Sequence, residues 1–117
     1  MKILIADDSP LLRSKLRDFL ESHEHEIVET DNGLDAVEMY KEETPEVVFM
    51  DILMPQLDGL SAMSQILEFD PKAQVIILTS MGQQSQIIEG IQNGAADFIV
   101  KPFEPGKVLS SIDKLKY

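Results

Sequence analysis

Four short apolar runs in this chain each end at a polar side chain. The runs cover residues 3–6, 47–50, 75–78 and 98–100, and they are followed by Asp7 and Asp8, Asp51, Thr79 and Lys101. Unbroken apolar runs of this length are typical of strands that are buried on both faces, as in a parallel sheet covered by helices. Groups that follow the carboxyl ends of such strands converge at one edge of the sheet, where ligands bind. We therefore expect three carboxylates, a hydroxyl and an ammonium to share one small pocket.

Size and composition indicate one folded domain, residues 1–117. Hydrophobic residues make up 44% of the 117 residues, which is enough for one core. No apolar stretch approaches the ~20 residues that a membrane helix needs. We expect no signal peptide, because a strand pattern directly follows Met1. The chain has no Cys, so it has no disulfide framework, and we expect a cytoplasmic protein.

The chain is strongly acidic, with a net charge of −11. That charge argues against binding to nucleic acid or to a membrane surface, both of which need a basic face. Residues 1–82 hold 17 acidic and 6 basic residues, whereas residues 83–117 hold four of each. Two interpretations stay open: chance combined with clustered site acids, or a C-terminal surface that repels a partner less.

Strand and helix patterns alternate along the chain, which predicts an α/β domain. We expect strands at 2–6, 26–30, 47–50, 75–78 and 98–100. We expect helices that begin near Ser9-Pro10, after the turn at Asp31-Asn32-Gly33, near Leu60, near Gln83 and after Pro105, the last of them ending near Lys114 or Lys116. The three most apolar strands belong at the centre, and right-handed crossovers then give the strand order 2-1-3-4-5 of a doubly wound, five-stranded parallel (βα)5 sheet.

Helical spacing predicts which side chains face this sheet. In the first helix these are Leu12, Leu16, Phe19 and Leu20, and in the second they are Leu34 and Val37, with Met39 or Tyr40 as further candidates. The strand at 26–30 is the least apolar and is expected at an edge.

The clustered carboxylates predict a cation site. If the pair Asp7-Asp8 stood alone before the first helix, one of the two would be interpreted as the cap of that helix. With Asp51 on the adjacent strand, three carboxylates repel one another, so the group must take up a proton or bind a cation. Carboxylates and a hydroxyl suit a hard divalent ion, Mg²⁺. Asp51 is also the best candidate nucleophile, since a carboxylate can attack an activated phosphorus to form an acyl phosphate.

The motifs together resemble the receiver domain of two-component response regulators, and most closely its stand-alone chemotaxis members. They are Asp7-Asp8, the segment 50–59 around Asp51 and Pro55, Thr79-Ser80, the segment 81–86, and the segment 95–103 around Lys101-Pro102. Each motif alone is weak, but their order at successive strand ends spans the whole chain.

The resemblance implies a role for each site residue. Asp51 accepts a phosphoryl group from a histidine kinase. Asp8, Asp51 and the backbone carbonyl of Leu53 bind Mg²⁺, and Asp7 holds a water molecule of the metal. Thr79 and Lys101 contact the phosphoryl oxygens.

Phe98 stands where the family has an aromatic switch residue, often Tyr, that turns inward when Thr79 moves. Phe98 lacks the hydroxyl on which an output contact through that hydrogen bond would depend, and a core aromatic on an edge strand is the alternative interpretation of this residue.

We also make predictions for five further positions. Leu53 and Met81 flank the pocket where the family places residues that govern attack by water, and two apolar side chains there predict a long-lived acyl phosphate. Leu11 is expected to be an exposed docking contact for the kinase. His23 and His25 are expected to be solvated rather than ligands.

The resemblance implies a switch rather than an enzyme, with no activity beyond phosphotransfer to itself and its own dephosphorylation. The output surface is expected at the helix 83–92, the strand 98–100 and the last helix, with a flagellar motor switch protein as the target of a monomer. A relay intermediate and a receiver from a larger regulator are the alternatives. A haloacid-dehalogenase-type phosphatase needs a second Asp where Leu53 stands, and a flavodoxin-like carrier would have its phosphate repelled by Asp7 and Asp8.

Overall fold

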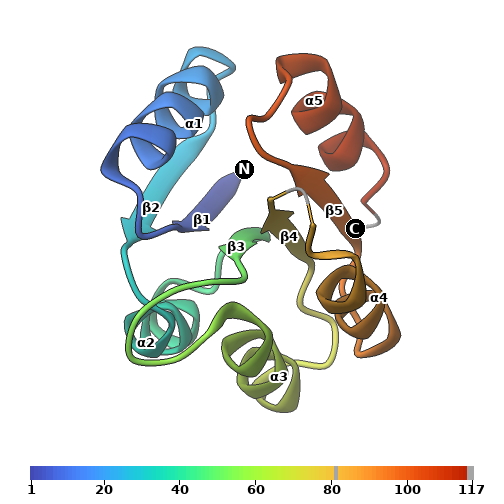
Figure 1. The fold of residues 1–117 in the computed structure, drawn as a ribbon. Helices are drawn as coiled ribbons and strands as arrows, with labels where there is room; N and C mark the ends of the chain where they lie inside the picture. The colour runs from blue at the N-terminus through green and yellow to red at the C-terminus, as the bar shows by residue number, and fades with distance from the viewer. Residues whose placement is uncertain (81, 116–117) are drawn as a thin grey trace.

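The fold is a parallel sheet of five strands between two layers of helices. A computed structural model describes residues 1–80 and 82–115 (Figure 1). The elements are β1 (Lys2–Ala6), α1 (Pro10–Ser22), β2 (Glu26–Thr30), α2 (Gly33–Glu43), β3 (Val47–Asp51), α3 (Gly59–Phe69), β4 (Val75–Thr79), α4 (Gln84–Gln92), β5 (Asp97–Val100) and α5 (Pro105–Asp113). The strand order β2-β1-β3-β4-β5 confirms the prediction.

Two separate cores cover the two faces of the sheet. Neighbouring residues of a strand point to opposite faces, so each strand contributes to both cores. Leu4, Val48 and Ile77 pack with α2 and α3, whereas Ile5 and Phe49 pack with α1 and α5. Figure 1 shows α1 and α5 on one side of the sheet and α2, α3 and α4 on the other. β1, β3 and β4 are buried on both faces, which is why their sequences are unbroken apolar runs.

Three side chains begin helices by accepting a hydrogen bond from a first-turn N–H group. Ser9 caps α1, Asn32 caps α2 and Asp58 caps α3. The expected turn at Asp31-Asn32-Gly33 is therefore the start of α2 itself. Pro10 and Pro105 are the first residues of their helices, where the absent N–H leaves no bond unmade.

The prediction that Leu34 of α2 faces the sheet is wrong. Its side chain is 50% exposed, whereas Ala36, Val37 and Tyr40 are buried. The buried stripe passes through Gly33, Val37 and Tyr40, which follow the i, i+4, i+7 spacing of one helix face, and Leu34 lies to its side. The Tyr40 hydroxyl donates a 2.8 Å hydrogen bond to Asp70 after α3, which ties these two helices together.

Smaller corrections concern the first helix and the element ends. Leu16 and Leu20 are buried, but Leu12 and Phe19 are only partly so. β3 and β4 are each one residue longer than expected, so Asp51 and Thr79 are the last residues of their strands. α5 ends at Asp113. Along residues 1–80 and 82–115, every helix is too short or too polar to span a bilayer.

Gly59 allows α3 to begin against the end of β3. Its N–H donates a 2.7 Å hydrogen bond to the carbonyl of Ile52. A Cβ at this position would collide with the carbonyl oxygen of Asp51 and would lie 2.8 Å from its carbonyl carbon. The backbone of Asp51 thus depends on a glycine eight residues later in the chain.

We predict that Gly59→Ala destabilises the protein by about 1–3 kcal/mol, because the end of β3 must move. Gly106→Ala is the matched control: nothing lies within 4 Å of a Cβ there, and alanine in α5 should be neutral or stabilising by about 0.5 kcal/mol. Urea unfolding of both variants measures the difference. Equal midpoints would contradict the close packing of Gly59 on Asp51.

Candidate functional site

Three carboxylates meet at the carboxyl edge of the sheet, as the sequence predicts. Asp7 and Asp8 follow β1, and Asp51 ends the neighbouring β3. One oxygen from each carboxylate lies within 4.8 Å of the others. Asp7 is 1% exposed and Asp51 is 6% exposed, whereas Asp8 is open to solvent. The group is therefore mostly dry, with one side open for a ligand to enter.

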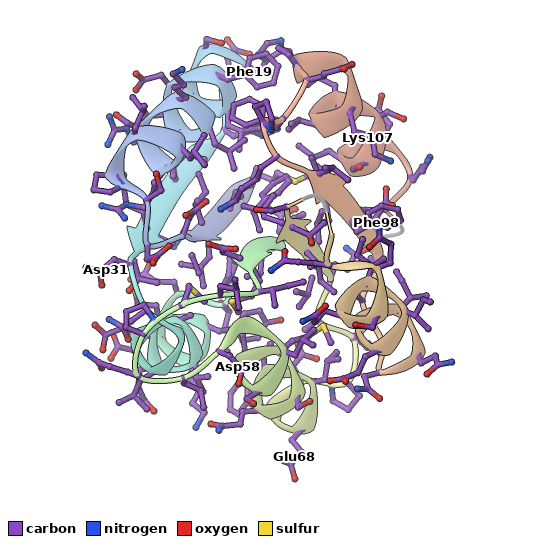
Figure 2. All side chains as sticks on the ribbon, viewed as in Figure 1. Phe19, Asp31, Asp58, Glu68, Phe98 and Lys107 are labelled. Atoms are coloured by element: carbon purple, nitrogen blue, oxygen red, sulfur yellow. The ribbon has the colours of Figure 1, made fainter. Side chains whose placement is uncertain are left out.

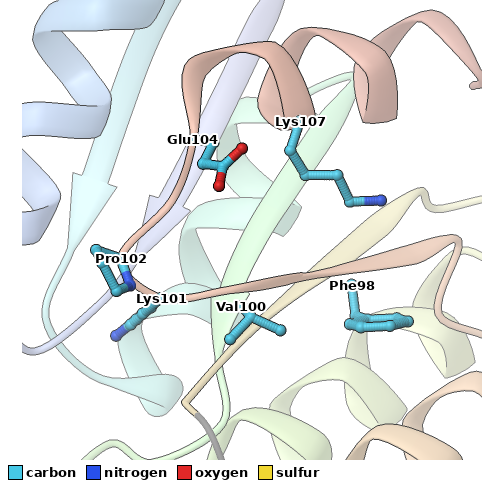
Figure 3. Close-up of a pocket in the computed structure, with 6 residues that line it drawn as sticks. All are labelled: Phe98, Val100, Lys101, Pro102, Glu104 and Lys107. Carbon is cyan, nitrogen blue, oxygen red and sulfur yellow. The ribbon is translucent and has the colours of Figure 1, made fainter.

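The ammonium group of Lys101 lies between the two buried acids. Lys101 Nζ is 2.9 Å from Asp7 Oδ2 and 3.0 Å from Asp51 Oδ2. Lys101 follows β5, and its bond to Pro102 is cis. Figure 3 shows the Lys101 side chain pointing away from Phe98, toward the end of the sheet. Within residues 1–80 and 82–115, one positive charge thus pairs with two buried carboxylates, which leaves the site with excess negative charge.

The pKa of the Asp51 carboxyl is raised in this environment. Burial raises the pKa of its carboxyl from the ordinary 3.8 to about 6, even though hydrogen bonding and charge attraction from Lys101 act in the opposite direction. Repulsion from Asp7 raises the pKa further, and a hydrogen bond from the backbone of Leu53 lowers it. Burial alone would lower the pKa of Lys101, but its bonds to Asp7 and Asp51 outweigh burial and raise that pKa.

Asp7 is held in place by the start of α1. Its Oδ1 accepts a 2.9 Å hydrogen bond from the N–H of Ser9, and its backbone carbonyl accepts one of 2.6 Å from Arg13. Arg13 in turn pairs with Glu29 on β2 at 2.8 Å. Ser9, rather than Asp7 or Asp8, caps the helix, so the capping alternative for the acid pair is wrong. The sequence did not point to Arg13, whose spacing from Asp7 carries no distinct signal.

Thr79 is fully buried at the end of β4, and its hydroxyl is already engaged. It donates a 2.7 Å hydrogen bond to Gln83 Oε1 and lies 3.3 Å from the carbonyl of Ser80. The N–H of Ser80 donates to the same Gln83 oxygen at 2.7 Å. Sequence reasoning identified Thr79 but not Gln83, because a glutamine in an amide-rich segment has no distinguishing pattern.

The remaining predicted residues lie around this centre or away from it. The side chain of Leu53 is 60% exposed, that of Leu11 is 64% exposed, and Met81 lies outside the described residues. His23 is exposed, and its ring contacts that of Phe19 in a tilted arrangement with centroids 4.6 Å apart. His25 is not fully solvated: it is partly buried, and its Nδ1 lies 3.2 Å from the amino terminus. Neither histidine is among the groups that meet at the acid cluster.

Phe98 lies on β5 between two surface cavities. One, of about 360 Å³, is lined by Phe98, Val100, Lys101, Pro102, Glu104 and Lys107 (Figure 3). The other, of about 350 Å³, is lined by Gln84, Ile87, Ile88, Phe98 and Val100. Lys107 Nζ lies 5.9 Å from the centroid of the Phe98 ring, and both side chains are labelled at the edge of the molecule in Figure 2. Phe98 is half-buried, so it is not a full member of either core.

Comparison with known proteins identifies the family. The model of the response regulator receiver domain matches residues 3–113. The chemotaxis protein CheY of Bacillus subtilis is 47% identical over 114 residues, which are 97% of this chain and 95% of that protein. Protein PilH of Pseudomonas aeruginosa is 38% identical over 114 residues, which are 96% of this chain and 94% of that protein. The CheY chain in a solved CheX–CheY–BeF3–Mg complex from Borrelia burgdorferi has a TM-score of 0.90 and 35% identity, with 96% of this chain and 86% of that chain covered.

The chain therefore belongs to the response regulator receiver family and is a phosphoacceptor of two-component signalling, similar to the CheY proteins of chemotaxis. The resemblance and the fold predicted from the sequence are both confirmed.

The raised pKa of Asp51 yields a pH-dependent stability. Because the folded-state pKa is above the ordinary value of 3.8, the folded protein holds this proton more tightly than the unfolded chain does. The resulting stabilisation is complete below pH 3.8 and is lost as the pH rises through about 6. At pH 7 the ionised Asp51 therefore weakens the metal-free fold.

We predict that Asp51→Asn, measured with EDTA, is more stable than the wild type at pH 7 by about 1–3 kcal/mol. The difference should shrink toward zero near pH 4. Glu68→Gln removes one negative charge from an exposed side chain that points away from α3 (Figure 2) and controls for net charge. A gap between Asp51→Asn and wild type that does not vary with pH would contradict the assigned shift.

Proposed function

We propose that Asp51 is the phosphoacceptor, that Asp7, Asp8 and the backbone carbonyl of Leu53 complete an Mg²⁺ site with it, and that Thr79 and Lys101 contact the phosphoryl oxygens. The observation that carries this proposal is the shared ammonium of Lys101, 2.9 Å and 3.0 Å from two buried carboxylates at adjoining strand ends. In the transfer, an Asp51 oxygen attacks the phosphorus of a phosphohistidine, the P–N bond breaks, and the histidine nitrogen leaves with the bonding electrons. The product is an acyl phosphate on Asp51.

The donor set fits a hard divalent cation. Three carboxylates supply oxygen ligands within 4.8 Å of one another, and one ammonium leaves them incompletely neutralised. Asp8 is the exposed member and can receive a hydrated ion from solvent. Bound Mg²⁺ would supply charge neutralisation for the transferring phosphoryl group. The Borrelia burgdorferi chain, which is similar over 96% of this one, was solved with BeF3 and Mg²⁺ and supports this choice of ion.

Lys101 changes partner during the reaction. Before transfer it pairs with both Asp7 and Asp51. Once Asp51 becomes an acyl phosphate, its carboxyl oxygens no longer carry a charge. The charged phosphoryl oxygens are then a stronger partner for Lys101. Lys101 thus holds the nucleophile in place first and binds the product afterward.

The proposed output surface is formed by α4, β5 and α5. Three apolar side chains are exposed on it, namely Ile88, Ile91 and Val100. The surface belongs to residues 83–117, where acidic and basic residues balance, so it repels an acidic partner less than the rest of the chain does. We propose a histidine kinase as phosphodonor and a flagellar motor switch protein as target of this surface. A relay intermediate is the second candidate function. The chain is similar to PilH as well as to CheY.

In this proposal the protein acts as a monomeric switch in the cytoplasm. It has no substrate other than its own phosphodonor and the water that removes the phosphoryl group.

The direct test is intact-mass measurement after incubation with acetyl phosphate. With Mg²⁺ we expect a gain of one phosphoryl group, and with EDTA or in Asp51→Asn we expect none. Lys101→Met should lower the yield while Mg²⁺ still binds, since the variant loses the ammonium that contacts the phosphoryl oxygens but keeps all three carboxylates. A wild type that binds Mg²⁺ but gains no mass, or a variant lacking Asp51 that gains the same mass, would refute the assignment.

The lifetime of the acyl phosphate remains a prediction. Because Leu53 is apolar and exposed beside the site, it offers no group to orient an attacking water. Exchanging Leu53 for Asn and Met81 for Glu should speed phosphate loss severalfold, measured by the decay of the phosphorylated mass after the donor is removed. Unchanged decay in the double variant would contradict the role of these positions.

A further inference from the structure

The side chain of Gln83 accepts hydrogen bonds from two donors at the edge of the site. Its Oε1 accepts from the hydroxyl of Thr79 and from the N–H of Ser80, both at 2.7 Å. A hydroxyl and a neighbouring backbone N–H that converge on one oxygen are a donor pair that a phosphoryl oxygen can also take. A hydroxyl has only one proton, so the Thr79 hydroxyl cannot donate fully to Gln83 and to a phosphoryl oxygen at once.

Gln83 is also the residue from which α4 begins. Its backbone carbonyl accepts the first hydrogen bond of the helix, from the N–H of Ile87 at 3.0 Å. Its side chain makes no capping hydrogen bond to α4, in contrast to Ser9, Asn32 and Asp58 at other helices. The backbone of Gln83 thus belongs to α4, while its side chain is tied back to the end of β4. This residue joins the site to the first element of the proposed output surface.

We propose that Gln83 is a positioning residue that holds Thr79 and Ser80 in the unphosphorylated state and competes with the phosphoryl group for them. This inference rests on the proposed function of Asp51 and Thr79. When the Thr79 hydroxyl turns to a phosphoryl oxygen, the Gln83 carboxamide is released, and the start of α4 loses its attachment to β4. By linkage, a partner that favours the released α4 also favours the phosphorylated state.

Removal of the Gln83 acceptor should therefore strengthen binding of a phosphoryl analogue. Gln83→Met keeps the length and shape of the side chain without the oxygen. We expect it to bind beryllofluoride with Mg²⁺ about three- to tenfold more tightly than the wild type, because two hydrogen bonds no longer have to be broken. Gln84→Met is the matched control, since Gln84 is the exposed first residue of α4 and no hydrogen bond to its side chain is found in the part of the chain described.

A second variant should weaken, rather than strengthen, the binding of beryllofluoride. Gln83→Glu keeps both contacts and makes them charge-assisted, so beryllofluoride should bind more weakly than in Gln84→Glu, which adds the same charge one residue later. In the ligand-free protein, hydrogen exchange at the N–H of Ile87 should be faster in Gln83→Met than in Gln84→Met, because α4 is no longer held to β4. A merely structural role of Gln83 would also speed exchange but would not tighten binding.

Titration calorimetry of all four variants gives separable outcomes. Tighter binding in Gln83→Met and weaker binding in Gln83→Glu, each relative to its Gln84 control, support the inference. Equal or weaker binding in Gln83→Met, with normal binding by the wild type, overturns it and leaves the function of Asp51 intact. Failure of the wild type to bind beryllofluoride with Mg²⁺ overturns the proposed site and this inference with it.

Discussion

The Lys101 ammonium, shared between Asp7 and Asp51, is the interaction on which the site depends. Without it, two buried carboxylates at adjoining strand ends would face each other at a cost that the fold would relieve by taking up a proton. With it, the pair is held but still carries excess negative charge, and burial, aided by repulsion from Asp7, keeps the pKa of Asp51 raised at about 6. In the proposed function, a divalent cation would complete the neutralisation, and a phosphoryl group on Asp51 would give Lys101 a new partner.

The backbone around the acids is held at several separate points. Arg13 binds the carbonyl of Asp7 from α1, and Gly59 lets α3 begin directly against Asp51. On the other side of the pocket, the end of β4 is tied to α4 through Gln83. Asp7 is thus held by hydrogen bonds from α1 and Asp51 by close packing against α3, whereas the Thr79 hydroxyl is bound to a single side chain of the proposed output surface.

Much of this arrangement could be predicted from the sequence, because it follows from strand topology. Apolar runs buried on both faces predict a parallel sheet, and the strand order brings Asp7, Asp8 and Asp51 to one edge. The contacts of individual side chains were harder to predict from the sequence. The prediction for Leu34 was wrong because its spacing from Val37 also fits an inward face, whereas the buried stripe begins at Gly33, which has no side chain to mark it. Arg13 and Gln83 were missed because their hydrogen bonds depend on loop geometry, which local patterns do not encode.

The raised pKa of Asp51 can be measured directly by carbon-detected NMR of its side-chain carboxyl in metal-free protein over pH 3 to 9. Our account predicts titration of the Asp51 carboxyl near pH 6. Saturating Mg²⁺ should move that transition to lower pH, because the cation favours the carboxylate. Titration near the ordinary 3.8 without metal, or a transition that Mg²⁺ does not move, would contradict the claim that one shared ammonium leaves this site in need of a cation.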